Sequence, residues 1–185
     1  MTRFGGAVLN IMLDSLITSK TRLRVIVKFF INAANRGHLN ALANEFGEST
    51  NGVRKELNKL KKAGYLISKN EGNKVVYLAN IKHPLYSTLQ ELVKKHLRLD
   101  EIVEAVLNRI GDVSSICLVG DYAKGIDSGT IEIIIDGLNL NKAYLLHLES
   151  KLSRLISRKV SLNICHEEVL NGVILYNKNI KYHEN

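Results

Sequence analysis

Residues 49–64, STNGVRKELNKLKKAG, govern the fold of the first part of this chain. The apolar residues Val53, Leu57 and Leu60 recur at the spacing of one helical face, while lysines, asparagines and one arginine fill most of the other positions. The small polar residues at the start are typical N-caps, and the glycine at the end is a typical signal for the end of a helix. The segment therefore predicts an amphipathic helix with one buried face and a strongly basic polar face.

The residues before this helix carry further helix signals. Apolar residues at helical spacing predict a helix over residues 8–17, a second one that follows the N-cap residue Ser19, and a short one over residues 38–46. Gly47 is expected to end the short helix, because glycine adopts the left-handed conformation of a helix C-cap at no steric cost. We predict that the connection after the second helix, residues 32–37, is a loop.

A β-hairpin is predicted after the basic helix, with strands over residues 65–67 and 74–79 on either side of a polar turn. The order of helix, short helix, capped basic helix and hairpin resembles the winged helix-turn-helix of small bacterial repressors, over residues 16–82. The matching segments are Ser19–Leu23, Leu42–Gly47, Val53–Leu60 and Ala63–Ile67. The resemblance implies that the first part of the chain binds double-stranded DNA.

The charge of the chain is divided unevenly, although its 26 Lys+Arg and 18 Asp+Glu give a formal net charge of only +8. Residues 1–98 hold 17 of the basic and 6 of the acidic side chains, a net of +11, whereas residues 99–185 hold 9 and 12, a net of −3. A basic first half is typical of a domain that meets a polyanion. The division favours DNA over two alternatives, a protein-docking module and a lysine-rich helix that is merely solvated.

The resemblance and the residue types together name candidate DNA contacts. The N-terminal residues of a recognition helix approach the base edges, and there Ser49, Thr50 and Asn51 suit phosphate contacts. Arg54 and Asn58 lie four residues apart and are types that pair with guanine and adenine. The remaining candidates, from the helix and the hairpin tip, are Lys55, Lys59, Lys62, Lys69, Asn70, Asn73 and Lys74.

The second half of the chain has a different succession of predicted secondary-structure elements. Its predicted elements are strands over residues 116–119, 130–135, 160–164 and 173–176, a helix over residues 141–156 and a helical turn over residues 167–170. The segment LVGDYAKG, which begins at Leu118, and the strand TIEIII, which begins at Thr130, resemble the glycine turn and the metal-binding strand of the nucleotidyltransferase fold. A generic βαβ fragment with a glycine turn is the alternative.

The chemistry of that family is only partly retained in these residues. The family's strand carries alternating aspartates that hold Mg²⁺ against the nucleotide phosphates, and the matching positions here are Thr130 and Glu132. Asp121 stands where the family has a serine, and the third strand offers no carboxylate. We therefore predict a degenerate nucleotide-binding motif and no catalytic residue, metal site or cofactor. The motif comprises Gly120, Asp121, Lys124, Gly125 and Glu132.

Together these signals predict an α+β fold in three parts. Residues 1–83 form a winged-helix DNA-binding domain, residues 84–111 a helical connector and residues 112–185 a small α/β nucleotidyltransferase-like domain. The predicted function is that of a DNA-binding transcriptional regulator, whose catalytically inactive second domain serves sensing or assembly. The alternative function is that of an active nucleotidyltransferase, with the winged helix as its substrate-docking domain.

Partners and location follow from the remaining features. The apolar helix at residues 8–17 and the helical connector are candidate surfaces for a homodimer, the alternative being that they bury against their own domains. A small-molecule or protein effector of the second domain is left open. No apolar run approaches the roughly 18 residues that a membrane span needs. Cys117 and Cys165 lie in apolar segments and are expected to be free thiols of a cytoplasmic protein.

Overall fold

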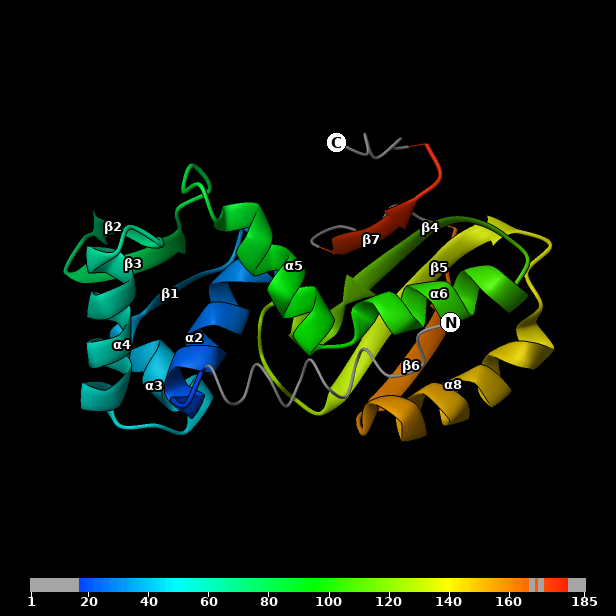
Figure 1. Ribbon diagram of the computed structural model, residues 1–185, viewed down its shortest axis with the longest axis horizontal. Coiled ribbons are helices and arrows are strands. Elements are labelled where there is room, and N and C mark those ends of the chain that lie inside the picture. Colours follow the sequence, from blue (N-terminus) through cyan, green and yellow to red (C-terminus); the bar gives the residue numbers. More distant parts are fainter. Residues whose placement is uncertain (1–16, 167–168, 170–171, 180–185) are drawn as a thin grey trace. The chain divides into compact units, whose positions relative to one another are not determined.

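The computed structural model describes residues 17–166, 169 and 172–179, and over these residues it contains seven helices and two β-sheets (Figure 1). The predicted α+β class is confirmed. The chain divides into two compact units, residues 1–96 with 124–126 and residues 97–123 with 127–185. The domain limits expected from the sequence, at residues 83 and 111, stay predictions. The expected helix at residues 8–17 lies almost wholly outside the described residues.

The first unit combines a small antiparallel sheet with helices. Its described elements are α2 (Lys20–Phe30), β1 (Arg36–His38), α3 (Leu39–Phe46), α4 (Thr50–Lys62), β2 (Leu66–Glu71), β3 (Lys74–Ala79) and α5 (Tyr86–His96). The strands lie in the order β1-β3-β2, so β3 pairs with both neighbours. Helix α2 packs against α4 and α5, and α3 packs against α4. The hairpin β2–β3 follows α4 directly (Figure 1).

Helices α2, α3 and α4 begin and end close to where the sequence signals predicted. Ser19 Oγ accepts a hydrogen bond from the backbone N–H of Arg22 at 3.2 Å, and Ser49 Oγ accepts one from that of Gly52 at 3.1 Å. Each serine therefore satisfies a donor that the first turn of a helix leaves unpaired. Gly47 ends α3 with a φ of 62°, a conformation that favours glycine. The three helices predicted between residues 19 and 64 are confirmed.

The core of the first unit lies between its helices and the sheet. Val25 and Phe29 of α2 and Val53 and Leu57 of α4 have no exposed surface. Each such side chain contributes about 1.5–3 kcal/mol relative to an exposed one. The predicted apolar face of α4 is confirmed, and its burial leaves the opposite face of the helix toward solvent.

The connection at residues 32–37, predicted as a loop, contains part of a strand, and this expectation was wrong. Strand β1 pairs antiparallel with β3, with Gly37 opposite Tyr77. A Cβ atom at Gly37 would lie 2.7 Å from Leu42 Cδ2, so glycine lets this strand approach α3 closely. A three-residue strand has too few residues for an alternating pattern, and its partner lies about forty residues away.

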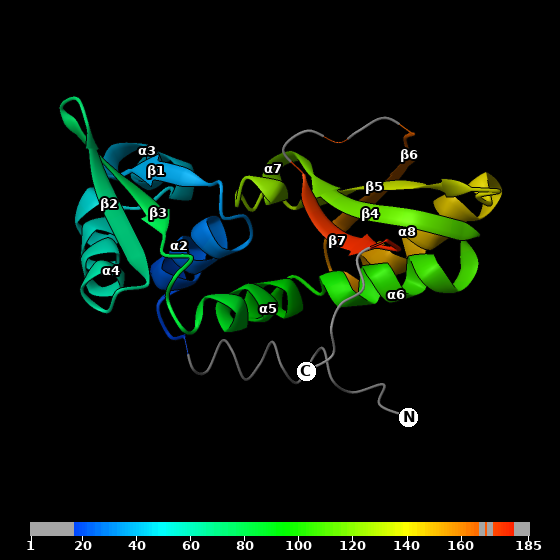
Figure 2. The ribbon, with the colours of Figure 1, turned by 90° about the horizontal axis from the view of Figure 1, so that it is seen from above.

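The second unit consists of a mixed four-stranded sheet and helices. Its described elements are α6 (Leu99–Arg109), β4 (Asp112–Val119), α7 (Gly120–Ala123), β5 (Thr130–Leu138), α8 (Lys142–Ile156), β6 (Lys159–Ile164) and β7 (Val173–Asn177). The strand order is β6-β5-β4-β7, in which β5 and β6 are parallel and the other pairs antiparallel. Helices α6 and α8 lie on one side of the sheet (Figure 2). The alternate residues Ile131, Ile133 and Ile135 of β5 are fully buried.

The differences from the predicted elements are small. Helix α7 lies within the segment that resembles a glycine turn, and β4 and β5 extend further than predicted. The expected helical turn at residues 167–170 lies outside the described residues, apart from residue 169. Among the helices of the described residues, none has the length and apolar character that crossing a membrane requires.

Side chains of α8 occupy the outer edge of strand β6. The Leu162 backbone N–H donates to Glu149 Oε1 at 2.6 Å, and the Val160 backbone N–H donates to Ser153 Oγ at 2.9 Å. These alternate N–H groups belong to a strand at the end of the sheet order. An edge strand otherwise presents unpaired N–H groups to other chains, and here the helix of the same unit satisfies them.

Candidate nucleic-acid interface

Helix α4 is held in the first unit by its apolar face and by one partly buried ion pair. Glu56 is 6% exposed, and its Oε2 atom accepts a hydrogen bond from Arg22 Nε at 2.8 Å. Its Oε1 atom accepts a hydrogen bond from Ser19 Oγ at 3.3 Å. Burial by itself raises the pKa of Glu56, but the hydrogen bond and charge of Arg22, with the charge of Lys59, hold the pKa below its ordinary value of 4.5. Glu56 is therefore an ionised, inward-facing partner of α2.

Other basic residues of α2 also pair within the unit. Lys28 Nζ donates to Glu45 Oε2 at 2.9 Å. Arg24 Nη1 donates to the backbone carbonyl of Phe46 at 2.6 Å and to Glu48 Oε1 at 2.9 Å. Part of the positive charge of the first half is thus neutralised by α3 and its C-terminal turn. The positive charge that faces solvent is concentrated on α4 and the hairpin.

The structure places every predicted DNA-contact residue at the surface of the first unit. Those on or before α4 are Ser49, Thr50, Asn51, Arg54, Lys55, Asn58, Lys59 and Lys62, and those of the hairpin are Lys69, Asn70, Asn73 and Lys74; all are exposed. On α4, the spacing of Asn51, Lys55, Asn58 and Lys62 puts them on one line along the helix, opposite its buried face. We call these four residues the outer line of α4.

Two contacts organise the start of α4. Arg54 Nη1 donates a hydrogen bond to Asn51 Oδ1 at 3.2 Å, between two exposed side chains one turn apart. Ser49 Oγ is engaged as the N-cap of the helix by Gly52 N–H. Ser49 therefore has a structural role that accompanies its predicted phosphate contact. The arginine and the asparagine form a small polar unit on the exposed side.

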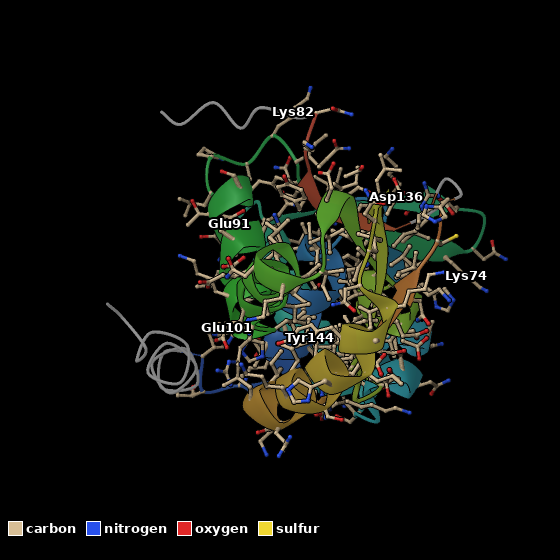
Figure 3. The ribbon with its side chains drawn as sticks, turned by 90° about the vertical axis from the view of Figure 1, so that its right-hand side faces the viewer. Lys74, Lys82, Glu91, Glu101, Asp136 and Tyr144 are labelled. Carbon is tan, nitrogen blue, oxygen red and sulfur yellow. The ribbon has the colours of Figure 1, made fainter. Side chains whose placement is uncertain are left out.

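The hairpin β2–β3 carries further positive charge. Lys69 lies on β2, Lys74 begins β3 and Asn73 lies in the turn between the strands, and Lys74 is labelled in Figure 3. The one acidic residue of the hairpin, Glu71, accepts a hydrogen bond from Arg36 Nη1 at 3.4 Å. This exposed pair reduces the repulsion that Glu71 would exert on a phosphate. Sequence reasoning missed Arg36, because its strand was predicted as a loop.

The degenerate motif of the second part of the chain lies at the junction of β4, α7 and β5. Gly120 has a φ of 65°, and a Cβ atom there would collide with the carboxylate of Glu132, so the two residues lie against each other. Asp121 is half-buried in α7, Lys124 is exposed and Gly125 has a φ of 73°. On the neighbouring strand Ser161 is opposite Glu132, and Asn163 is opposite Ile134. Neither of these two partners is a carboxylate.

A buried tyrosine fixes the loop that follows α7. Tyr122 has no exposed surface, its hydroxyl donates a hydrogen bond to Asp127 Oδ1, and it accepts one from Arg158 Nε at 3.0 Å. Burial, and then the hydrogen bond to the Asp127 carboxylate, raise the pKa of Tyr122 to about 12. No sequence signal indicates this network, because Tyr122 lies in a glycine-bearing polar segment without apolar periodicity.

Comparisons with known proteins give only distant similarities. No family model and no curated protein matches this chain. The crystal structure of the AntR antimony-specific transcriptional repressor aligns with 20% identity and a TM-score of 0.36, covering 51% of this chain and 78% of that one. Human N-acetylserotonin methyltransferase (ASMT) in complex with SAM aligns with 15% identity and a TM-score of 0.30, covering 60% of this chain and 37% of that one. At such TM-scores neither protein informs function, and the candidate interface rests on the chain's own residues.

Proposed function

We propose that this chain is a transcriptional regulator that binds double-stranded DNA through a winged helix-turn-helix, in which α4 is the recognition helix and β2–β3 the wing. The observation that carries the proposal is which charged side chains of α4 are buried and which are exposed. Its single acidic residue, Glu56, is buried against Arg22, whereas its lysines and Arg54 are exposed. The outward face of the helix therefore has no carboxylate to repel a phosphate backbone.

The dimensions and ends of α4 support the same role. Its 13 residues span about 20 Å, and the major groove of B-DNA is wide enough to admit an α-helix. Its N-terminus begins with small polar residues, which allow backbone N–H groups to approach phosphates. Helix α3 precedes it across a short turn at Gly47, and the hairpin with its lysines follows. This succession is the one that a winged helix uses on DNA.

For the second unit we propose a nucleotidyltransferase-like module that does not transfer nucleotides and serves ligand sensing or assembly. Support comes from the residues around Glu132. Thr130 lies two residues before it on the same strand, Ser161 lies opposite it on the adjacent strand, and neither is a carboxylate. A single carboxylate does not provide the two-metal clamp of such enzymes. Incubation with labelled nucleotides and Mg²⁺ distinguishes this proposal from the alternative, an active nucleotidyltransferase with a docking winged helix. Label transfer that Glu132→Ala abolishes would establish the enzyme.

The DNA-binding proposal is tested by selecting bound sequences from a random double-stranded library and measuring affinity as a function of salt. Affinity should fall steeply as salt rises, because bound phosphates release counterions. The variant Lys55→Glu/Lys62→Glu should abolish binding. Its matched control is Lys95→Glu/Lys151→Glu, which reverses two exposed lysines outside α4 and the hairpin and should bind almost as well. Equal loss in both variants, or binding insensitive to salt, would contradict a specific role for α4.

A two-fold dimer completes the proposal, because two recognition helices double the contacts over a near-palindromic site. Light scattering measures the oligomeric state of the full chain directly. Removing residues 1–15 tests whether the apolar N-terminal segment is the essential interface. Dimers that persist after this deletion would assign the interface to another surface, such as α5 or α6.

A further inference from the structure

Two asparagines lie on the outer line of α4, at its first and third turns. Asn51 and Asn58 are seven residues apart, so they differ by only about 20° around the helix axis. Both side chains are exposed, on the side opposite the buried Val53 and Leu60. Of all positions on α4, those of the outer line project furthest from the core of the unit, which makes them the first to meet the floor of a groove.

The chemistry of asparagine specifies which base each of them would read. A side-chain amide offers one acceptor and one donor side by side, and this pair matches the N6–H and N7 groups of adenine in the major groove. The hydrogen bond from Arg54 Nη1 to Asn51 Oδ1 orients the amide of Asn51. The oxygen keeps a second lone pair for the adenine amino group, so the arginine and the base can bind it together.

The spacing of the two asparagines sets the spacing of the bases. Seven residues of α-helix correspond to about 10.5 Å along the axis, and consecutive base pairs of B-DNA are about 3.4 Å apart. A helix that is inclined to the groove covers somewhat fewer base pairs for the same length. We infer that α4 reads two adenines, one with Asn51 and one with Asn58, which lie two to three base pairs apart in each half-site. This inference rests on the proposed function.

The other two residues of the outer line fit this arrangement. Lys55 lies between the asparagines and Lys62 lies beyond Asn58, and both are exposed. A lysine ammonium is a point charge on a flexible stem, so it can reach phosphates at the groove walls without a fixed direction. The planar amides then supply the discrimination between bases, and the lysines supply affinity.

The test compares four versions of the full chain in the same random-library selection: the natural sequence, Asn51→Ala, Asn58→Ala and Asn108→Ala. Asn108 is an exposed asparagine of α6, so its replacement controls for the general effect of this substitution on a helix surface. All three substituted positions are exposed, and alanine favours helix, so folding should be retained. Unfolding curves check this directly.

The natural chain should select two adenines two to three base pairs apart. Asn58→Ala should lose the preference at one of these positions and Asn51→Ala at the other, each with about a tenfold to hundredfold loss of affinity on the selected site. On a site in which the adenine that a variant no longer reads is replaced by another base, that variant and the natural chain should bind with equal affinity. Asn108→Ala should retain both preferences.

Two outcomes would overturn the inference in distinguishable ways. If the natural chain binds DNA in a salt-dependent manner but selects no such adenines, or if Asn58→Ala leaves the selected sequence unchanged, the assignment of bases fails while the proposed DNA binding stands. If the natural chain binds no DNA at any salt concentration, the proposed function fails, and the assignment of bases fails with it.

Discussion

The guanidinium of Arg22 and the carboxylate of Glu56 meet at 2.8 Å, which joins the first turn of α2 to the middle of α4. The same carboxylate accepts a hydrogen bond from the hydroxyl of Ser19, the residue that caps α2. One acidic side chain thus connects the start of one helix to the inner face of the other. Arg22, although basic and in the first half, is therefore paired within the fold.

Removal of this carboxylate should destabilise the first unit. Glu56→Ala leaves Arg22 without its partner on a partly buried surface, so we expect the free energy of unfolding to fall by about 1–3 kcal/mol. Denaturant unfolding of the two single variants and of Arg22→Ala/Glu56→Ala gives the coupling energy. The exposed pair Arg36 and Glu71 serves as control, and its coupling should not exceed about 0.5 kcal/mol. Equal coupling in the two pairs would contradict a special role for Glu56.

The stability contributed by Glu56 should depend on pH. Because the pKa of Glu56 in the folded chain lies below its ordinary value of 4.5, the unfolded chain binds the proton more readily. The contribution is therefore complete above about pH 4.5 and is lost as the pH falls through the folded-state pKa. We expect the difference in unfolding free energy between the natural chain and Glu56→Gln to shrink on acidification. A difference that stays constant from neutral pH to pH 3 would refute this prediction.

Arg54 should contribute to both affinity and specificity for DNA. Arg54→Ala should cost about 1–3 kcal/mol of binding free energy on the selected site and should relax the preference at one position. The measurement is the affinity for the selected site and for single-base variants of it, with Arg109→Ala, an exposed arginine of α6, as control. Uniform weakening on all sequences would make Arg54 a phosphate contact instead.

Tyr122 should stabilise the loop of the second unit as a neutral hydroxyl. Tyr122→Phe removes the hydrogen bonds with Asp127 and Arg158, so we expect the unfolding free energy to fall by about 1–2 kcal/mol. The raised pKa of about 12 means that this contribution is present below pH 10 and is lost as the pH rises toward 12. Tyr144→Phe, at a half-buried position labelled in Figure 3, is the control. Equal losses of unfolding free energy in the two variants would show that the Tyr122 hydroxyl contributes no more to stability than that of Tyr144.

The elements around α4 were predictable because their signals are local. The cap at Ser49, the glycine at position 47 and the spacing of Val53, Leu57 and Leu60 all act within a few residues, and the structure has them as expected. Strand β1 was not predictable in the same way. Its three residues acquire their conformation from pairing with β3, and no sequence pattern within the segment indicates that partner.

The candidate site was predictable in its exposed part and not in its supporting part. The lysines, asparagines and Arg54 of α4 were identified from helical spacing. The same spacing puts Glu56 beside Val53 and Leu60, which is a signal for burial, but its partner Arg22 is 34 residues away in the chain. The network of Tyr122, Asp127 and Arg158 likewise depends on tertiary contacts.

The hydrogen bonds from the β6 backbone to Glu149 and Ser153 have a consequence for assembly and solubility. An open edge strand invites pairing with the edge of another molecule, which leads to sheet-extended dimers and to aggregation. Here an incoming strand would have to displace two side chains of α8 before it could accept the Val160 and Leu162 N–H groups. Growth of the sheet through this edge is therefore disfavoured, and we expect the proposed dimer to form through another surface.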